Sequence, residues 1–180
     1  MLRWPPRGGP ARPVAGTEER TVGAAENKQL VLEWFTSGPY GGEEMLTDDF
    51  VWHTPKGPAT LLSGGDPHFG RDALAQLGVI ERAAYRGGAE YEMVFCIAED
   101  DWVVMQLNVT STSYDDVVYS NVYVMTVRCE GGKVAELWEH ADTKLWWDTI
   151  VGTPEQYAAV EQRLASERAA LSGGTPPASS

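Results

Sequence analysis

Residues 89–143, AEYEMVFCIAEDDWVVMQLNVTSTSYDDVVYSNVYVMTVRCEGGKVAELWEHADT, carry the clearest structural pattern in the chain. It contains four long runs in which successive residues alternate between the two faces of an extended chain. Short turns that are acidic or contain glycine separate these runs. The runs are residues 91–98, 102–113, 117–129 and 133–143. A period of two is typical of β-strands, and close turns between long strands indicate an antiparallel meander.

Working outward from this stretch, the flanking segments carry helical patterns. The apolar residues Leu30, Val31, Trp34 and Phe35 predict a helix that ends at Gly38. Further helices are expected around residues 42–46, over residues 73–84 and from Thr153 onward, and a strand is expected over residues 50–54. Helices followed by strands predict an α+β fold, in which helices pack on one face of a curved antiparallel sheet. Such a sheet forms a cone, and its interior makes an apolar pocket for a small molecule.

The length of 180 residues predicts a single domain with tails. Residues 1–24 are rich in Pro, Gly and Arg and are expected to be a flexible extension. We assign residues 25–150 to the cone domain, residues 151–171 to a C-terminal helix and residues 172–180 to a disordered tail.

The charge of the chain excludes several classes of partner. The formal net charge is −12, which disfavours nucleic acid and anionic membrane surfaces. No apolar run approaches the roughly 18 residues of a membrane-spanning helix, and no secretory signal pattern is present. The two cysteines, Cys96 and Cys129, lack metal-binding or redox spacing. We therefore expect a cytoplasmic protein with reduced thiols, no metal and no cofactor.

Several local strings carry a family resemblance: DFVW at 49–52, FGRDA at 69–73, YSNVY at 119–123, and GKV leading to EHADT at 132–143. With them the chain resembles SnoaL-like and ketosteroid-isomerase-related proteins of the nuclear-transport-factor-2-like superfamily, including limonene-epoxide-hydrolase and polyketide-cyclase relatives. The resemblance covers roughly residues 25–150, with His140 in place of the usual Tyr. It implies a cone-shaped α+β fold and a C2 homodimer.

The resemblance also implies roles for single residues. The catalytic aspartate of the epoxide hydrolases falls on Glu139, and their Arg-x-Asp pair falls near Gln106 and Asn108. The general base of the steroid isomerases falls on Thr54, which cannot abstract a proton. Neither catalytic set is complete, although the carboxylate at 139 is kept.

Glu139 is the sharpest candidate in the chain. Strand alternation places it on one face with Ala135, Leu137 and Ala141, a setting natural for a pocket, where burial raises a carboxyl pKa toward neutrality. Such a group suits general acid–base catalysis. The alternative is a glutamate on the outer face, or one paired structurally.

The remaining candidate site residues follow from the same alternation and from the resemblance. Tyr123 and His53 join Glu139 as candidate catalytic residues. The candidate substrate-binding residues are Trp52, Thr54, Gln106, Asn108, Asn121 and Leu137. Packing in the core is the alternative for the aromatic residues, and a solvated strand face is the alternative for Gln106 and Asn108.

Two functions remain open. The first is a cofactor-free enzyme of specialised metabolism (polyketide or terpenoid biosynthesis) that binds a small apolar substrate and performs acid–base cyclisation, isomerisation, dehydration or epoxide opening. The second is a non-catalytic module of the same fold that binds a small molecule or a protein. A homodimer is expected through the uncovered sheet face, to which we assign Met105, Leu107, Val109 and Trp138.

Overall fold

The computed structural model describes residues 22–37, 42–56, 65–70 and 72–171. Residues 1–21 of the expected N-terminal extension and the whole expected tail, residues 172–180, lie outside the described residues. The expected end of the first helix at Gly38 also lies outside them.

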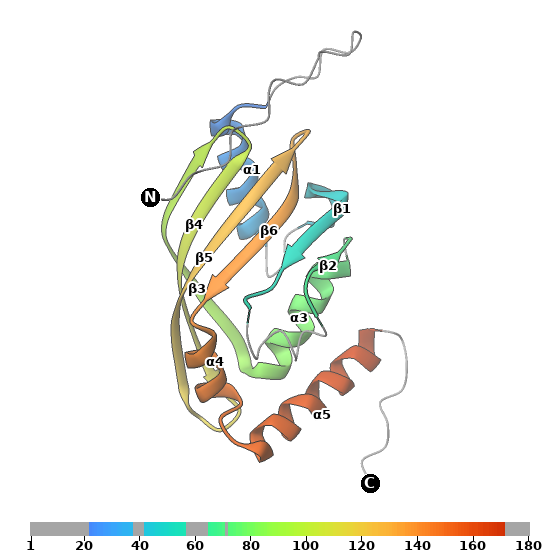
Figure 1. The fold of residues 1–180 in the computed structure, drawn as a ribbon, viewed down its shortest axis with the longest axis vertical. Helices are drawn as coiled ribbons and strands as arrows, with labels where there is room; N and C mark the ends of the chain where they lie inside the picture. The colour runs from blue at the N-terminus through green and yellow to red at the C-terminus, as the bar shows by residue number, and fades with distance from the viewer. Residues whose placement is uncertain (1–21, 38–41, 57–64, 71, 172–180) are drawn as a thin grey trace, which may run out of the picture.

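A six-stranded sheet forms the body of the molecule, in the order β2-β1-β6-β5-β4-β3 (Figure 1). The strands are β1 (Leu46–His53), β2 (His68–Phe69), β3 (Tyr85–Glu99), β4 (Trp102–Ser113), β5 (Val118–Glu130) and β6 (Lys133–Ala141). Strands β3 to β6 form the predicted antiparallel meander. Strand β1, however, runs parallel to β6, so the sheet is mixed rather than wholly antiparallel. Non-local pairing of this kind leaves no signature in the local pattern.

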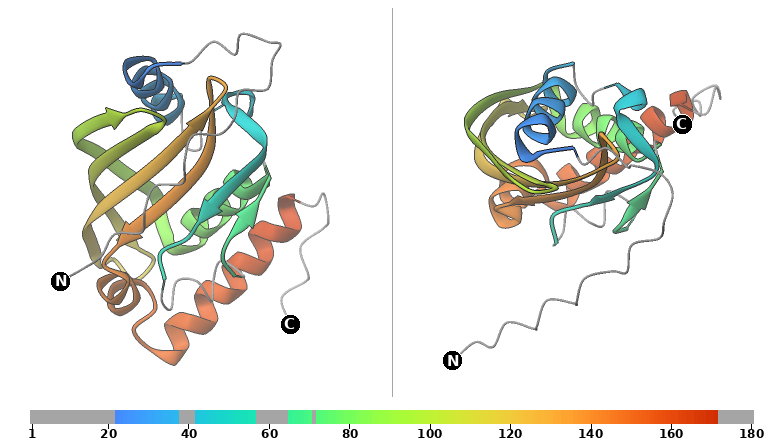
Figure 2. Two further views of the ribbon diagram at one scale, coloured as in Figure 1. Left: turned by 45° about the horizontal axis from the view of Figure 1, so that its top comes forward. Right: turned by 90° about the horizontal axis from the view of Figure 1, so that it is seen from above.

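Two helices fill the concave side of the sheet. Helix α1 (Ala24–Thr36) packs against β3, β4 and β6, and helix α3 (Asp72–Ala84) packs against β1, β2 and β3. Figure 2 shows the sheet curving around both of them. Helix α5 (Pro154–Leu171) lies outside α3 and contacts it, and a short 3-10 helix, η1 (Glu43–Met45), precedes β1. The molecule is therefore an α+β cone, as the sequence predicts.

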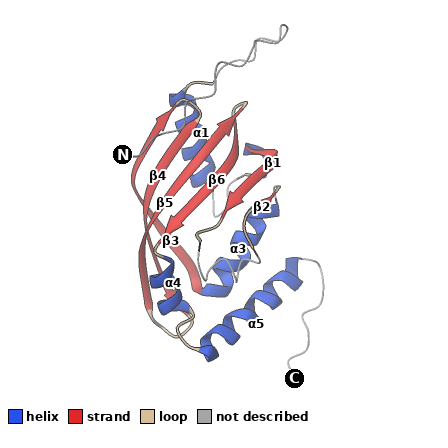
Figure 3. Ribbon diagram, viewed as in Figure 1, coloured by secondary structure: helices blue, strands red, loops and turns tan. Residues whose placement is uncertain are grey.

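Helix α4 (Thr143–Ile150) was not expected from the sequence. It begins directly after β6 and packs beside β5, at the lower end of the sheet in the view of Figure 3. Asp142 is its N-cap and accepts a hydrogen bond from the backbone N–H of Leu145 at 2.9 Å. The residue therefore has the capping role that Asp favours at a helix start.

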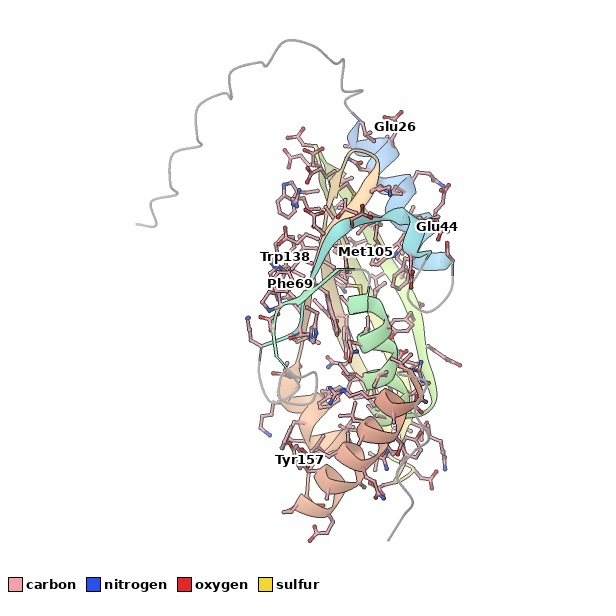
Figure 4. The ribbon with its side chains drawn as sticks, turned by 90° about the vertical axis from the view of Figure 1, so that its right-hand side faces the viewer. Glu26, Glu44, Phe69, Met105, Trp138 and Tyr157 are labelled. Atoms are coloured by element: carbon pink, nitrogen blue, oxygen red, sulfur yellow. The ribbon has the colours of Figure 1, made fainter. Side chains whose placement is uncertain are left out.

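The apolar residues of β4 lie on the covered, inner face of the sheet, whereas they were expected from the sequence on the uncovered face. Met105, Leu107 and Val109 are fully buried in the core, so they do not belong to an uncovered face. Figure 4 shows Met105 between the sheet and the helices and Trp138 at the outer surface. Of the residues expected on the uncovered face, Trp138 alone lies there. Alternation separates the two faces of a strand but does not say which of them is covered.

In the part of the chain that the structure describes, no helix is long and apolar enough to cross a membrane.

Candidate active site

A pocket lies inside the cone, between the concave face of the sheet and helix α3, with α4 at its end. About 70 Å³ of its interior is open to the centre of a water molecule. The walls are mostly aromatic and aliphatic, with a few polar groups. The lining residues are Trp52, Thr54, Pro55, Leu77, Ile80, Glu81, Ala84, Tyr85, Tyr91, Val109, Tyr123, Glu139, Ala141, Thr143 and Trp146.

Glu139 projects into this pocket from β6 and is 8% exposed. Burial raises its pKa to about 7; a hydrogen bond from Trp52 opposes the rise, and the nearby Glu81 carboxylate adds to it. The Trp52 indole N–H donates to Glu139 Oε2 at 3.2 Å. A carboxyl group that titrates near neutrality can both accept and return a proton.

Trp52 reaches Glu139 because β1 lies beside β6. The parallel register places Trp52 opposite Leu137, two residues before Glu139. On its other side, the Trp52 ring stacks on His68, with ring centroids 4.9 Å apart. Burial lowers the pKa of His68, and its buried Nε2 has no hydrogen-bond partner in the structure. His68 therefore packs behind the indole as part of β2.

A second carboxylate, which our reading of the sequence missed, faces the same pocket. Glu81 projects from α3, is 9% exposed and accepts a short hydrogen bond from the Tyr91 hydroxyl. Burial raises its pKa, against the effects of Tyr91 and of the nearby Arg82 charge. A signal was present in the sequence. Glu81 falls among the apolar stripe of Leu77, Ile80 and Ala84, where a helix that covers a sheet rarely carries an acid.

Three tyrosines form a hydroxyl cluster at one wall. The hydroxyls of Tyr119 and Tyr123 lie 2.9 Å apart, and the rings of Tyr85 and Tyr119 stack at 5.5 Å. Asn121 Nδ2 donates to Tyr119 at 2.7 Å, and the Trp146 indole N–H donates to Tyr85 at 2.9 Å. Burial raises the pKa of all three phenols, so they stay protonated near neutral pH and can donate hydrogen bonds.

The structure brings some of the predicted site residues together. Trp52, Thr54, Tyr123 and Glu139 all line the pocket. Asn121 is buried beside it and holds Tyr119 and the Asp142 carbonyl, while Leu137 is a core residue. These two shape the site without lining it.

Other predicted site residues lie elsewhere. His53 is on the outer face, where Nε2 lies 2.7 Å from Glu136 Oε1 and the ring stacks on Trp138 at 4.8 Å. Gln106 and Asn108 also lie on the outer face, and Asn108 donates to Glu92 there at 3.1 Å. The expectation that Gln106 and Asn108 face the pocket was wrong, because the apolar residues of β4 occupy the inner face of the sheet.

The described residues include no group of three or more His, Cys, Asp or Glu side chains placed to hold a metal ion.

The described geometry is that of a nuclear-transport-factor-2-like cone, and comparison with known proteins supports this. The chain belongs to the SnoaL-like domain family, whose model matches residues 20–137. A search of curated proteins finds no match.

Solved structures with the same fold are distant in sequence. A SnoaL-like polyketide cyclase from Jannaschia sp. CCS1 is 16% identical, with a TM-score of 0.61 over 77% of this chain and 100% of that one. A nuclear-transport-factor-2-like protein from Burkholderia pseudomallei K96243 is 19% identical, with a TM-score of 0.61 over 70% and 98%. An LEH-like epoxide hydrolase from M. tuberculosis is 12% identical, with a TM-score of 0.53 over 75% and 96%. These likenesses concern the fold alone.

Proposed function

We propose that the protein is a small-molecule enzyme that uses Glu139 as a general acid–base group in an apolar pocket. The observation that carries this proposal is a buried carboxyl with a pKa of about 7, set among aromatic walls and held by one indole N–H. The reaction class is cyclisation, isomerisation, dehydration or epoxide opening. All of these need a proton to be moved at a defined atom.

The chemistry follows from the positions of the groups. In an isomerisation of a β,γ-unsaturated ketone, the Glu139 carboxylate takes a proton from the carbon next to the carbonyl. The electron pair of that C–H bond forms a carbon–carbon double bond, and the π pair of the carbonyl moves to its oxygen, which gives a dienolate. A phenol of Tyr85 or Tyr123 stabilises that oxygen by donating a hydrogen bond. The protonated Glu139 then returns the proton to the γ-carbon while the oxygen pair reforms the carbonyl, so the product is the α,β-unsaturated ketone, atoms and charge balance, and the carboxylate is regenerated.

The family supports the class of reaction without fixing the substrate. One solved protein of the same fold is named as a SnoaL-like polyketide cyclase and another as an LEH-like epoxide hydrolase. Both names describe chemistry on small organic molecules.

A second candidate is a binding module without chemistry. The loss of the Arg-x-Asp pair and of the isomerase base at Thr54 favours it. In this case the same pocket holds a ligand, and Glu139 acts only as a polar anchor.

Deuterium exchange separates the two candidates without knowledge of the natural substrate. A panel of small enolisable ketones is incubated with the protein in D2O, and mass spectrometry follows deuterium incorporation at carbon. We expect at least one ketone to exchange faster with the protein, and Glu139→Gln to lower that rate by about 10²–10⁴-fold. The matched control is Glu136→Gln, on the outer face of the same strand. Equal exchange by wild type and Glu139→Gln would contradict the catalytic role.

A further inference from the structure

We propose that the pocket selects an organic cation, a small molecule with a protonated or quaternary amine, over neutral and anionic ligands of the same shape. The inference rests on the same site as the proposed function and names the class of its ligand. Three features of the described residues carry it: the balance of charge, the aromatic walls and an unpartnered hydroxyl.

The pocket holds two acids and no base. Glu81 and Glu139 are 9% and 8% exposed, and none of the described lining residues is Lys, Arg or His. The hydrogen bonds found for these side chains are one to each carboxylate, from Tyr91 to Glu81 and from Trp52 to Glu139. An ionised carboxylate can accept about four. A buried charge is costly without a counterion. A cationic ligand would provide the counterion that the described lining residues do not provide.

The walls suit a cation as well. Trp52, Tyr85, Tyr91, Tyr123 and Trp146 all contribute to the lining. The faces of aromatic rings carry partial negative charge and attract ammonium groups, at about 0.5–2 kcal/mol for each well-placed ring. An apolar neutral ligand gains burial in such a pocket, whereas a cation gains burial and this attraction together.

Thr54 offers an independent polar contact for a ligand in this pocket. It is 4% exposed, lines the pocket, and its buried Oγ1 has no hydrogen-bond partner in the structure. Its backbone N–H is already used, donating to Asp66 Oδ1 at 2.8 Å. Buried hydroxyls are nearly always paired, so a ligand hydroxyl or carbonyl is the natural partner.

The charge of the whole chain acts in the same direction. At −12, it raises the local concentration of cations and repels carboxylates and phosphates. An anion entering the pocket would meet two carboxylates without a compensating cation among the described lining residues. The ligand we infer is therefore a small ammonium compound that also bears a hydroxyl or carbonyl group.

Three probes of similar shape test this inference: choline, the neutral 3,3-dimethylbutan-1-ol and the anionic 3,3-dimethylbutanoate. Binding to the full chain is measured by isothermal titration calorimetry near pH 8, above the Glu139 pKa of about 7. We expect choline to bind at least about tenfold more tightly than the alcohol, and the anion not to bind. Equal or tighter binding of the alcohol or the anion, or no saturable binding of any probe, would overturn the proposal.

Two variants test whether Glu81 is responsible for the preference for a cation. Glu81→Gln keeps the side-chain shape and is expected to weaken choline by about tenfold while leaving the alcohol unchanged. The matched control is Glu92→Gln, an exposed acid that contacts Asn108 on the outer face. An unchanged choline affinity in Glu81→Gln, with native near-ultraviolet circular dichroism, would contradict the role of Glu81. Choline selectivity without deuterium exchange would overturn only the proposed catalysis, and exchange without selectivity would overturn only this inference.

Discussion

The burial of Glu139 makes the stability of the protein depend on pH. Its pKa is about 7 in the folded chain and about 4.5 when exposed. The folded state therefore binds more protons between these values, and the free energy of unfolding falls as pH rises from about 4.5 through 7. The full effect is on the order of 3 kcal/mol. Urea unfolding at several pH values measures this slope, and Glu81 adds to it with the same sign because its pKa is also raised.

Glu139→Gln provides the comparison for that measurement. It keeps the acceptor for Trp52 but carries no charge, so we expect a flatter pH profile and a more stable protein than wild type near pH 8. Glu136→Gln should keep the wild-type slope, since that side chain is paired with His53 and Arg128 on the outer face. A wild-type slope in Glu139→Gln would show that the carboxyl titrates as an exposed group.

Some residues that line the pocket were predicted from the sequence and others were not. Glu139 was placed correctly because its neighbours on one strand face are small and apolar. Glu81 was not predicted, although it interrupts the apolar stripe of Leu77, Ile80 and Ala84 on helix α3. Gln106 and Asn108 were placed on the wrong face, since period-two alternation is symmetric and both faces of β4 are partly apolar.

Among the elements, helix α4 connects the end of the sheet to the pocket. Asp142 caps its N-terminus, and Trp146 on the same helix lines the pocket and donates to Tyr85. We expect Asp142→Ala to lower the free energy of unfolding by about 1 kcal/mol, measured by urea titration. Asp148→Ala, which removes an exposed i,i+4 pair with Lys144, should cost about 0.5 kcal/mol or less. Equal effects of the two changes would contradict the capping role.

Local sequence patterns predict some of the helices and strands of this fold and not others. The meander and the helices α1 and α3 follow from period and turn residues, which act over a few positions. The parallel pairing of β1 with β6 joins segments far apart in the chain, so no local signal specifies it. Helix α4 was not predicted: the strand was expected to run to residue 143 and the next helix to begin at Thr153, because the Trp-rich sequence between them is short and follows the strand without a break.

On the scale of the whole molecule, the outer face of the sheet carries an apolar surface. Phe95, Ile97, Trp102 and Val122 are 41%, 59%, 42% and 48% exposed, and strand register places them on the same side as Trp138. Exposed apolar surface of this kind is typical of an interface. We still predict a C2 homodimer through this face. Its apolar residues are these side chains together with Trp138, and not the buried Met105, Leu107 and Val109.

Sedimentation velocity tests the dimer. Ile97→Glu places a charge in the apolar face and should weaken association by about tenfold or more. Leu171→Glu, at the exposed end of α5, should leave it unchanged. A wild-type monomer at micromolar concentration would contradict the prediction.

The assignment of Glu139 as the acid–base group is tested by measuring its pKa by ¹³C NMR of the labelled carboxyl group, with Glu139→Gln as the assignment control. We predict a midpoint near 7 and a further rise of about one unit in Trp52→Phe, which removes the indole donor. A midpoint near the ordinary value of 4.5 would show that the carboxyl is solvated and ionised at neutral pH, and would contradict its assignment as the acid–base group of the pocket.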